Sequence, residues 1–346
     1  MATRVGIVGA SGFTGAELLR LIAGHPDLEV VVATGDSQAG TAVADLYPSL
    51  ASAYGHLTFT PYVEGVADDH GLDLVFCGLP HGVAGDRARP ARREPGGGGP
   101  GRRLPPEGRR AVPHLVRPRA HRAHLLAESV YGLPELFRAE LAEAKLVATP
   151  GCYVTTATLA LAPLLAAGLV APTGIVVDAA SGVSGAGRPP KPTNAFNTVD
   201  ENFVAYGMLD HRHTPEIEQN LAGVAGADVQ VLFTPHLAPM NRGILATCYA
   251  RPTAATSTDE LRQVLHAAYD AEPFVEVRHE PPSTKATLGS NAVHVTAYAD
   301  DRTGWVVALA ALDNLTKGAS GGALQSANVA LGLPEAAGLP VAGLYP

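Results

Sequence analysis

The chain has 346 residues, a length that favours two domains over one. Its formal net charge is −8. The sequence has three cysteines and does not open with a charged segment followed by an apolar stretch, a pattern that excludes a disulfide-stabilised secreted protein and indicates the cytoplasm. The longest apolar run, residues 153–170, is interrupted by Pro163 and Gly168, which argues against a membrane span.

The first forty residues predict a βαβ unit. Residues 4–8 and 28–33 have the apolar pattern of buried strands, and residues 17–22 that of a helix. Between them lies GASGFTG at positions 9–15, where glycines let backbone amides and a positive helix end approach a pyrophosphate. We therefore expect a Rossmann-type dinucleotide-binding domain.

The choice of cofactor depends on the end of the second strand. Asp36 would hold a ribose 2′-hydroxyl and favours NAD, whereas Ser37 would accept a 2′-phosphate and favours NADP. The local residues leave both open.

Residues 72–77 form a further predicted strand, and an unusual segment follows it. Residues 86–122 contain eleven arginines and three acidic residues, so the net charge of this segment is 11 − 3 = +8. The remainder of the chain therefore carries a net charge of −8 − 8 = −16. A nucleic-acid-binding arm is disfavoured, because no aromatic or lysine residues are interleaved with the arginines and the rest of the chain is acidic. A surface insertion is a second interpretation. We favour a third: residues 85–123 are a misread frame bounded by two compensating frameshifts.

Regular patterning resumes near residue 128, and a strand at 145–148 ends the first domain. Cys152 then opens a helix at 153–167. Amides at a helix start stabilise a thiolate, so we expect a lowered pKa and a nucleophilic role for Cys152. Cys77 and Cys248 lie inside apolar strands and are predicted to pack.

The second half of the chain predicts an α+β domain on a mostly antiparallel sheet. Helices are expected at 215–221 and 258–271, and a last helical run at 314–331. The strand-like runs are residues 174–179, 229–234, 243–249, 294–299 and 305–312.

Two histidines, His211 and His213, stand just before a predicted helix start. Thr214 is the expected N-cap and Pro215 the first helical residue. The positive helix end favours neutral imidazole, the form that a general base requires, although a capping role is the alternative. No further residue completes a metal site at this spacing, so no metal is expected.

Basic residues follow two later turns. Arg188 and Lys191 come after a glycine-rich turn at 181–187, and Arg242 precedes a strand. Together they suit an anionic substrate, although each could be a solvated surface charge.

Eight motifs match a known family in order and spacing. They are GASGFTG (9–15), LPHG (79–82), YGLPE (131–135), PGCY (150–153), SGVSGAGR (181–188), HRHTPEI (211–217), PMNRGIL (239–245) and DNLTKG (313–318). With them the chain resembles the N-acetyl-γ-glutamyl-phosphate reductases over nearly its whole length, except residues 85–123.

The resemblance implies a glyceraldehyde-phosphate-dehydrogenase-like fold. Residues 1–148 would bind NADP, residues 149–313 would form the catalytic and oligomerisation domain, and residues 314–346 would return to the NADP domain. The protein would be a homo-oligomer, a dimer or tetramer, with no nucleic-acid or membrane partner.

The resemblance also implies a reaction. Cys152 would attack the γ-acyl phosphate and expel phosphate, NADPH would reduce the thioester, and a histidine would move the proton, with a slight preference for His211 over His213. The implied cofactor contacts are Gly9, Ser11, Gly12, Phe13, Thr14, Gly15, Ser37, Pro80, Ser184, Gly185 and Asn314. Arg188 and Arg242 would contact the substrate.

Three alternatives stay open at this point. Aspartate-semialdehyde dehydrogenase shares the chemistry, but its motifs around the cysteine and the histidine fit less well. An aminoadipyl-phosphate reductase of lysine synthesis would differ in substrate pocket and partner. An inactive dinucleotide-binding protein is the third.

Overall fold

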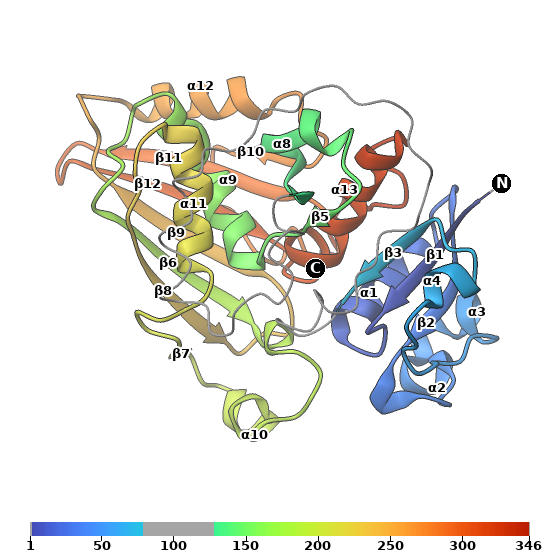
Figure 1. The fold of residues 1–346 in the computed structure, drawn as a ribbon. Coiled ribbons are helices and arrows are strands. Elements are labelled where there is room, and N and C mark those ends of the chain that lie inside the picture. Colours follow the sequence, from blue (N-terminus) through green and yellow to red (C-terminus); the bar gives the residue numbers. More distant parts are fainter. Residues whose placement is uncertain (1, 79–127, 346) are drawn as a thin grey trace. The chain divides into compact units, whose positions relative to one another are not determined.

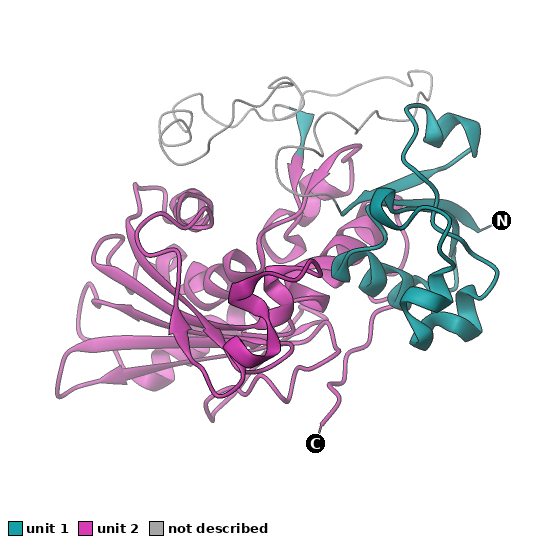
Figure 2. Cartoon of the chain, turned by 90° about the horizontal axis from the view of Figure 1, so that it is seen from below, with its two compact units in different colours: residues 1–129 teal, residues 130–346 magenta. Residues whose placement is uncertain are grey.

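The computed structural model describes residues 2–78 and 128–345. The chain forms two compact units, residues 1–129 and 130–346, which are coloured separately in Figure 2. The suspected misread segment and Pro80 lie outside the described residues. The expected functional limits at residues 148 and 313 stay a prediction, because compact units are defined by contacts between residues and not by what each part binds.

The first unit contains the predicted βαβ pattern. Strand β1 (Thr3–Val8) pairs in parallel with β2 (Leu28–Thr34) on one side and with β3 (Leu74–Cys77) on the other. Helix α1 (Phe13–Ile22) connects β1 to β2 and buries its leucines. β1 is apolar and buried over residues 5–8, as expected for the middle strand of a parallel sheet. Short helices follow β2: η1 (Asp36–Gln38), α2 (Val43–Leu46), η2 (Pro48–Leu50), α3 (Ala51–Tyr54) and α4 (Val66–Asp69).

The second unit is built on a seven-stranded sheet in the order β10-β11-β12-β9-β6-β8-β7 (Figure 1). Its strands are β6 (Ile175–Gly182), β7 (Val204–Ala205), β8 (Val231–Ala238), β9 (Ile244–Ala250), β10 (Val275–Val277), β11 (Val293–Asp300) and β12 (Trp305–Leu312). Only the β10–β11 and β6–β8 neighbours are parallel among these described pairs, so the predicted mostly antiparallel sheet is confirmed.

Three helices share one hydrophobic core with alternate residues of this sheet. They are α9 (Cys152–Ala166), α11 (Thr214–Ala225) and α12 (Thr258–Tyr269). α9 is apolar all round and buried from residue 153 to residue 165, which places its first residue, Cys152, at the edge of the core. The opposite sheet face exposes apolar side chains, including Leu232 and Tyr249.

Several shorter elements complete this unit. β4 (Val130–Tyr131) pairs in parallel with β5 (Val147–Ala148), and α8 (Pro134–Leu141) lies between them in sequence. The predicted last helix is confirmed over residues 316–331: it begins as a π-helix, η6 (Thr316–Ser320), which continues directly into α13 (Gly321–Leu331). Two 3₁₀ turns and one short helix complete the unit: η4 (Val183–Ala186), η5 (Pro192–Asn194) and α10 (Phe196–Val199).

The predicted packing role is confirmed for Cys248 and is wrong for Cys77. Cys248 is buried in β9, as expected, but the Cys77 side chain is exposed. Cys77 is the last residue of β3, so the apolar strand does not enclose it.

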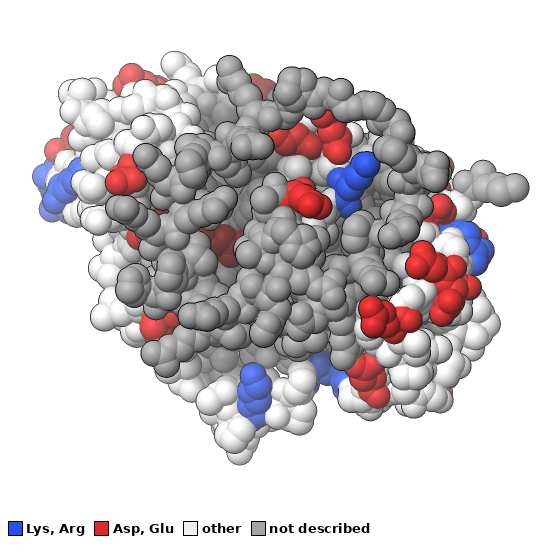
Figure 3. All heavy atoms as spheres, viewed as in Figure 1, with Lys and Arg blue, Asp and Glu red and all other residues white. Residues whose placement is uncertain are grey.

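The surface carries both signs of charge. On the face in Figure 3, acidic and basic side chains of the described residues are scattered, without a continuous basic area among them. No helix among the described residues is long and apolar enough to cross a membrane.

Candidate active site

Cys152 is the first residue of α9, as the sequence predicts. Gly151 precedes it in extended conformation, and the Gly151 carbonyl accepts from the Thr155 amide at 3.0 Å, which starts the helix. The Thr156 hydroxyl donates to the Cys152 carbonyl at 2.9 Å. The thiol is half-buried. The Cys152 side chain is thus fixed where the core and the start of α9 meet.

The predicted lowering of the thiol pKa is wrong for this structure. Burial raises the pKa of Cys152 to about 11, against the opposing effects of the Tyr153 backbone amide and the Arg212 charge. The desolvation of a thiolate at the core edge therefore outweighs the helix-start amides. At neutral pH this thiol keeps its proton unless a neighbouring base takes it.

His213 is the imidazole closest to the cysteine turn. It is the buried N-cap residue of α11, which begins at Thr214, so the helix starts one residue earlier than predicted. A Cβ added at Gly151 would lie 2.3 Å from His213 Nε2. Only a glycine at 151 lets the imidazole lie against the peptide that precedes Cys152.

His211 lies one ring further from that turn. Its ring centroid is 4.7 Å from that of His213, and its Nδ1 accepts from the His213 amide at 3.2 Å. The rings of Tyr153, Tyr206 and Phe233 surround it edge-on. Burial, helped by the Arg212 charge, lowers the pKa of His211 to about 4. The predicted neutral imidazole is confirmed for His211, but burial and not the helix end is the main cause.

Glu216 is a site residue that sequence reasoning missed. Its Oε1 accepts from the Tyr131 hydroxyl at 2.7 Å and from the Gly151 amide at 3.2 Å. Burial raises the pKa of Glu216, while the two donors and Arg212 oppose this. Its position three residues after His213, in the first turn of α11, was the available signal. α11 therefore holds the Gly151 peptide by both a ring and a carboxylate.

Arg212 was also missed. Its side chain is exposed, and its charge opposes the raised pKa of both Cys152 and Tyr206. The guanidinium thus lies within electrostatic range of the thiol. Its place between the two histidines was the signal.

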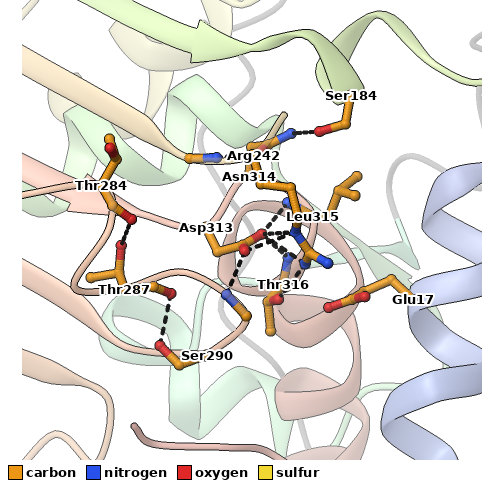
Figure 4. Close-up of polar contacts among 12 residues, drawn as sticks. Glu17, Ser184, Arg242, Thr284, Thr287, Ser290, Asp313, Asn314, Leu315 and Thr316 are labelled. Carbon is orange, nitrogen blue, oxygen red and sulfur yellow. Dashed lines mark hydrogen bonds and ion pairs between the residues drawn. The ribbon is translucent and has the colours of Figure 1, made fainter. Parts of the chain in front are cut away.

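Asp313 organises the turn before η6 (Figure 4). Its fully buried carboxylate accepts from the amides of Gly289, Leu315 and Thr316 at 2.7, 2.9 and 3.0 Å. Arg242 donates to the same carboxylate through Nε and Nη2, and Nη2 also donates to Thr316 Oγ1 at 2.8 Å. Arg242 thus braces this turn, and its predicted substrate contact stays a prediction.

Asn314 and Ser184, both predicted to contact cofactor, lie together (Figure 4). Asn314 Nδ2 donates to Ser184 Oγ at 3.0 Å, and Asn314 Oδ1 accepts from the Gly243 amide at 2.7 Å. Gly185 is exposed beside Ser184, and Arg188 is half-buried after the same turn. The structure therefore brings the 184–188 turn and residue 314 to one place in the second unit.

The glycine turn of the first unit has the shape that a dinucleotide needs. Gly9 has φ +84°, and a Cβ at Gly15 would lie 2.4 Å from Ala10 Cα, so both positions require glycine. Gly12 is the N-cap of α1, where a Cβ would meet nothing nearer than 3.6 Å. Backbone amides at this helix start can accept a pyrophosphate. Ser11, Phe13 and Thr14 belong to the same turn.

The end of β2 bears on the 2′-phosphate. Asp36 and Ser37 are both exposed, and Asp36 Oδ1 accepts from the Tyr62 amide at 2.8 Å.

Among the described residues, no group of three or more His, Cys, Asp or Glu side chains is placed to hold a metal ion.

Comparison with known proteins identifies the same two-part organisation. The semialdehyde dehydrogenase NAD-binding domain matches residues 4–96, and the semialdehyde dehydrogenase dimerisation domain matches residues 152–314. The N-acetyl-gamma-glutamyl-phosphate reductase of Pelotomaculum thermopropionicum is 46% identical, with all of both chains covered. The reductase of the same name from Acidothermus cellulolyticus is 47% identical, again over the whole of both chains.

Solved structures share the fold at low identity. Aspartate semialdehyde dehydrogenase II of Vibrio cholerae has a TM-score of 0.64 at 13% identity, covering 96% of this chain and 98% of its own. The Candida albicans aspartate semialdehyde dehydrogenase with NADP has a TM-score of 0.62 at 14% identity, covering 95% and 98%. The α/β fold, with a Rossmann-like parallel sheet and a second mixed sheet, is thus that of the semialdehyde dehydrogenases.

Proposed function

The chain belongs to the N-acetyl-γ-glutamyl-phosphate reductases within the semialdehyde dehydrogenase family, and from this premise we propose how its residues divide the reaction. The reaction is the reduction of N-acetyl-γ-glutamyl phosphate to N-acetylglutamate 5-semialdehyde and phosphate, a step of arginine biosynthesis. The observation that carries the assignment of roles is the close approach of His213 to Gly151, directly before Cys152.

Cys152 acts as the nucleophile. Its sulfur bonds to the γ-carbonyl carbon, the bond from that carbon to the phosphate oxygen breaks, and a thioester remains. Because burial raises the pKa of the thiol to about 11, a base has to accept its proton. We assign this to His213, whose imidazole lies against the cysteine turn, in place of the slight preference for His211 drawn from the sequence.

His211 supports this base. Its Nδ1 accepts from the His213 backbone amide, and its low pKa keeps it neutral at pH 7. A neutral neighbour does not repel the positive charge that His213 gains when it takes the proton. After hydride addition, the electron pair of the tetrahedral oxygen re-forms the carbonyl and the carbon–sulfur bond breaks, which releases the aldehyde. His213 returns its proton to the departing sulfur, so the Cys152 thiol and the neutral imidazole are restored.

A nicotinamide dinucleotide, when bound, supplies the hydride that reduces the thioester carbon. The glycine turn at 9–15 suits its pyrophosphate, and Ser184, Gly185 and Asn314 are the proposed contacts in the second unit. We propose NADP over NAD. The Asp36 carboxylate accepts a backbone amide, which weakens the argument that it binds a ribose hydroxyl, and Ser37 is exposed beside it.

The anionic groups of the substrate need cations. Arg188 keeps its predicted role, and we add Arg212, which is exposed and lies within electrostatic range of Cys152. A cation there would hold the acyl phosphate near the sulfur and stabilise the leaving phosphate.

A homo-oligomer is the proposed assembly. The matched family is a dimerisation domain, and one face of the seven-stranded sheet exposes Leu232 and Tyr249 at 50% and 37%. An apolar sheet face of this kind suits an isologous interface. Light scattering that gives a monomer at micromolar concentration would refute it.

Replacement of the nucleophile tests the mechanism. Cys152→Ser removes the thioester route and should lower turnover by several orders of magnitude, with dinucleotide binding unchanged because the glycine turn is intact. The assay is phosphate-dependent oxidation of the semialdehyde, with fluorescence titration of NADPH alongside. Near-normal turnover in this variant would end the thioester mechanism.

A further inference from the structure

The second unit contains a buried lysine that the mechanism above does not use. Lys317, in the π-helix η6, has a side chain only 1% exposed, and its partner Glu135 on α8 is 0% exposed. Lys317 Nζ donates to Glu135 Oε1 and, at 2.6 Å, to Gln325 Oε1. Lysine is rarely buried to this degree, since each unpaired buried ion costs several kcal/mol.

Gln325, on α13, links this pair to further polar groups. Gln325 Nε2 donates to Glu135 Oε1 at 3.0 Å and to Glu335 Oε1 at 2.8 Å. Asn291 Nδ2 donates to Gln325 Oε1 at 2.9 Å. Burial alone would raise the pKa of Glu135, but the Lys317 charge and the hydrogen bonds outweigh it and hold this pKa below its usual value. Glu135 is therefore ionised at neutral pH.

The residue after Lys317 lies directly against the nucleophile. A Cβ added at Gly318 would lie 2.8 Å from Cys152 Cβ and 3.3 Å from Cys152 Cα. The Gly318 amide donates to the carbonyl of Asp313, five residues earlier, at 3.0 Å, which is the hydrogen bond that defines a π-turn. Such turns are rare within helices and frequent at functional sites.

Stability alone does not account for this arrangement. An apolar pair of similar volume is often as stable as a buried ion pair, or more so. An ion pair additionally imposes a defined geometry, because Lys317 Nζ and the Glu135 carboxylate oxygen have to meet at one point in a dry interior. The pair therefore fixes the η6 backbone at residue 317, one residue before Gly318, which contacts Cys152.

We infer that Lys317 and Glu135 are positioning residues for Cys152, acting through the Gly318 backbone on which the cysteine rests. The inference depends on the proposed nucleophilic role of Cys152. It assigns the ion pair no contact with substrate or cofactor.

A double variant separates positioning from stability. Lys317→Met with Glu135→Leu removes both charges at once, so neither is left unpaired. We expect a folded protein whose kcat is reduced by about tenfold or more, because small misplacements of a reacting group are costly. The KM for the semialdehyde and the affinity for NADPH should stay close to the wild type. A folded double variant with wild-type kcat would overturn the inference.

A control variant removes a hydrogen bond to α9, the helix that Cys152 begins, and leaves both charges of the pair in place. The buried Tyr269 hydroxyl donates to the Leu159 carbonyl on α9 at 2.8 Å. Tyr269→Phe should lower stability by about 1 kcal/mol and leave kcat unchanged. An equal loss of kcat in this control would show that any weakening of α9 slows the enzyme, and would also overturn the inference.

A second variant covers the case in which the double variant does not fold. Gly318→Ala adds one methyl group 2.8 Å from Cys152 Cβ, so η6 or the cysteine has to shift. We expect a lower kcat in a folded protein, and wild-type kcat would exclude η6 as the support. Cys152→Ser distinguishes the two hypotheses: if it is inactive while the ion-pair variants turn over normally, only the positioning inference fails.

Discussion

Replacement of Gly151 by alanine tests whether His213 is the base. An alanine Cβ would lie 2.3 Å from His213 Nε2 and 2.6 Å from its Cδ2 and Cε1, whereas real Cβ contacts essentially never fall below 3.0 Å. The imidazole is buried, at 5% exposed, so it has little free space into which to turn. The ring or the cysteine turn therefore has to move by about 1 Å to reach ordinary contact.

The expected cost follows from this displacement. A misplacement of about 1 Å can reduce the rate about 100-fold, which is about 2.7 kcal/mol at 1.36 kcal/mol per factor of ten. Overpacking should also lower stability by about 1–3 kcal/mol. The measurements are kcat and KM in phosphate-dependent semialdehyde oxidation, and denaturant unfolding to establish that the variant is folded under assay conditions.

Gly223 gives the matched control. It lies on α11, the helix that begins after His213, and a Cβ there would meet nothing within 4 Å. Gly223→Ala should raise stability by about 0.5–1 kcal/mol and leave kcat unchanged. A folded Gly151→Ala variant with wild-type kcat would refute the assignment of His213, since the geometry leaves no room for both groups.

Three further predictions concern cofactor, pH and the unusual segment. Turnover efficiency should be higher with NADPH than with NADH, and equal or better use of NADH would show that Asp36 determines the choice. His211 has a folded pKa of about 4, below its ordinary 6.5, so it contributes stability that is present above about pH 6.5 and lost as the pH falls toward 4. Denaturant unfolding at pH 7 and pH 5 should show this loss, and His211→Asn should reduce it; an undiminished loss in the variant would assign it to other groups. Resequencing the coding DNA across residues 85–123 should reveal a neighbouring frame that encodes an alternating apolar stretch. Confirmation of the present frame together with a soluble, active enzyme would refute the frameshift.

Local sequence patterns determined much of the fold. Strand and helix periodicity predicted β1, α1 and β2, the long helix after Cys152 and the principal strands of the second sheet, because these patterns depend on neighbours within a few residues. The glycine turn at 9–15 was recognisable for the same reason, since positive φ and close approach act within a single turn. Cys152 was identified by its position at a helix start.

Only the tertiary structure decided how these parts meet at the site. The choice of His213 rests on the packing of residue 213 against residue 151, and no periodicity reports a contact between segments so far apart in sequence. The thiol pKa was predicted in the wrong direction, because the helix start is visible in the sequence but the desolvation of Cys152 by the packed core is not. The π-turn η6 at the start of the last helix was unpredictable for the same reason: the Asp313 carboxylate that contacts it and the buried pair of Lys317 with Glu135 are tertiary contacts, and the local sequence predicts an ordinary helix.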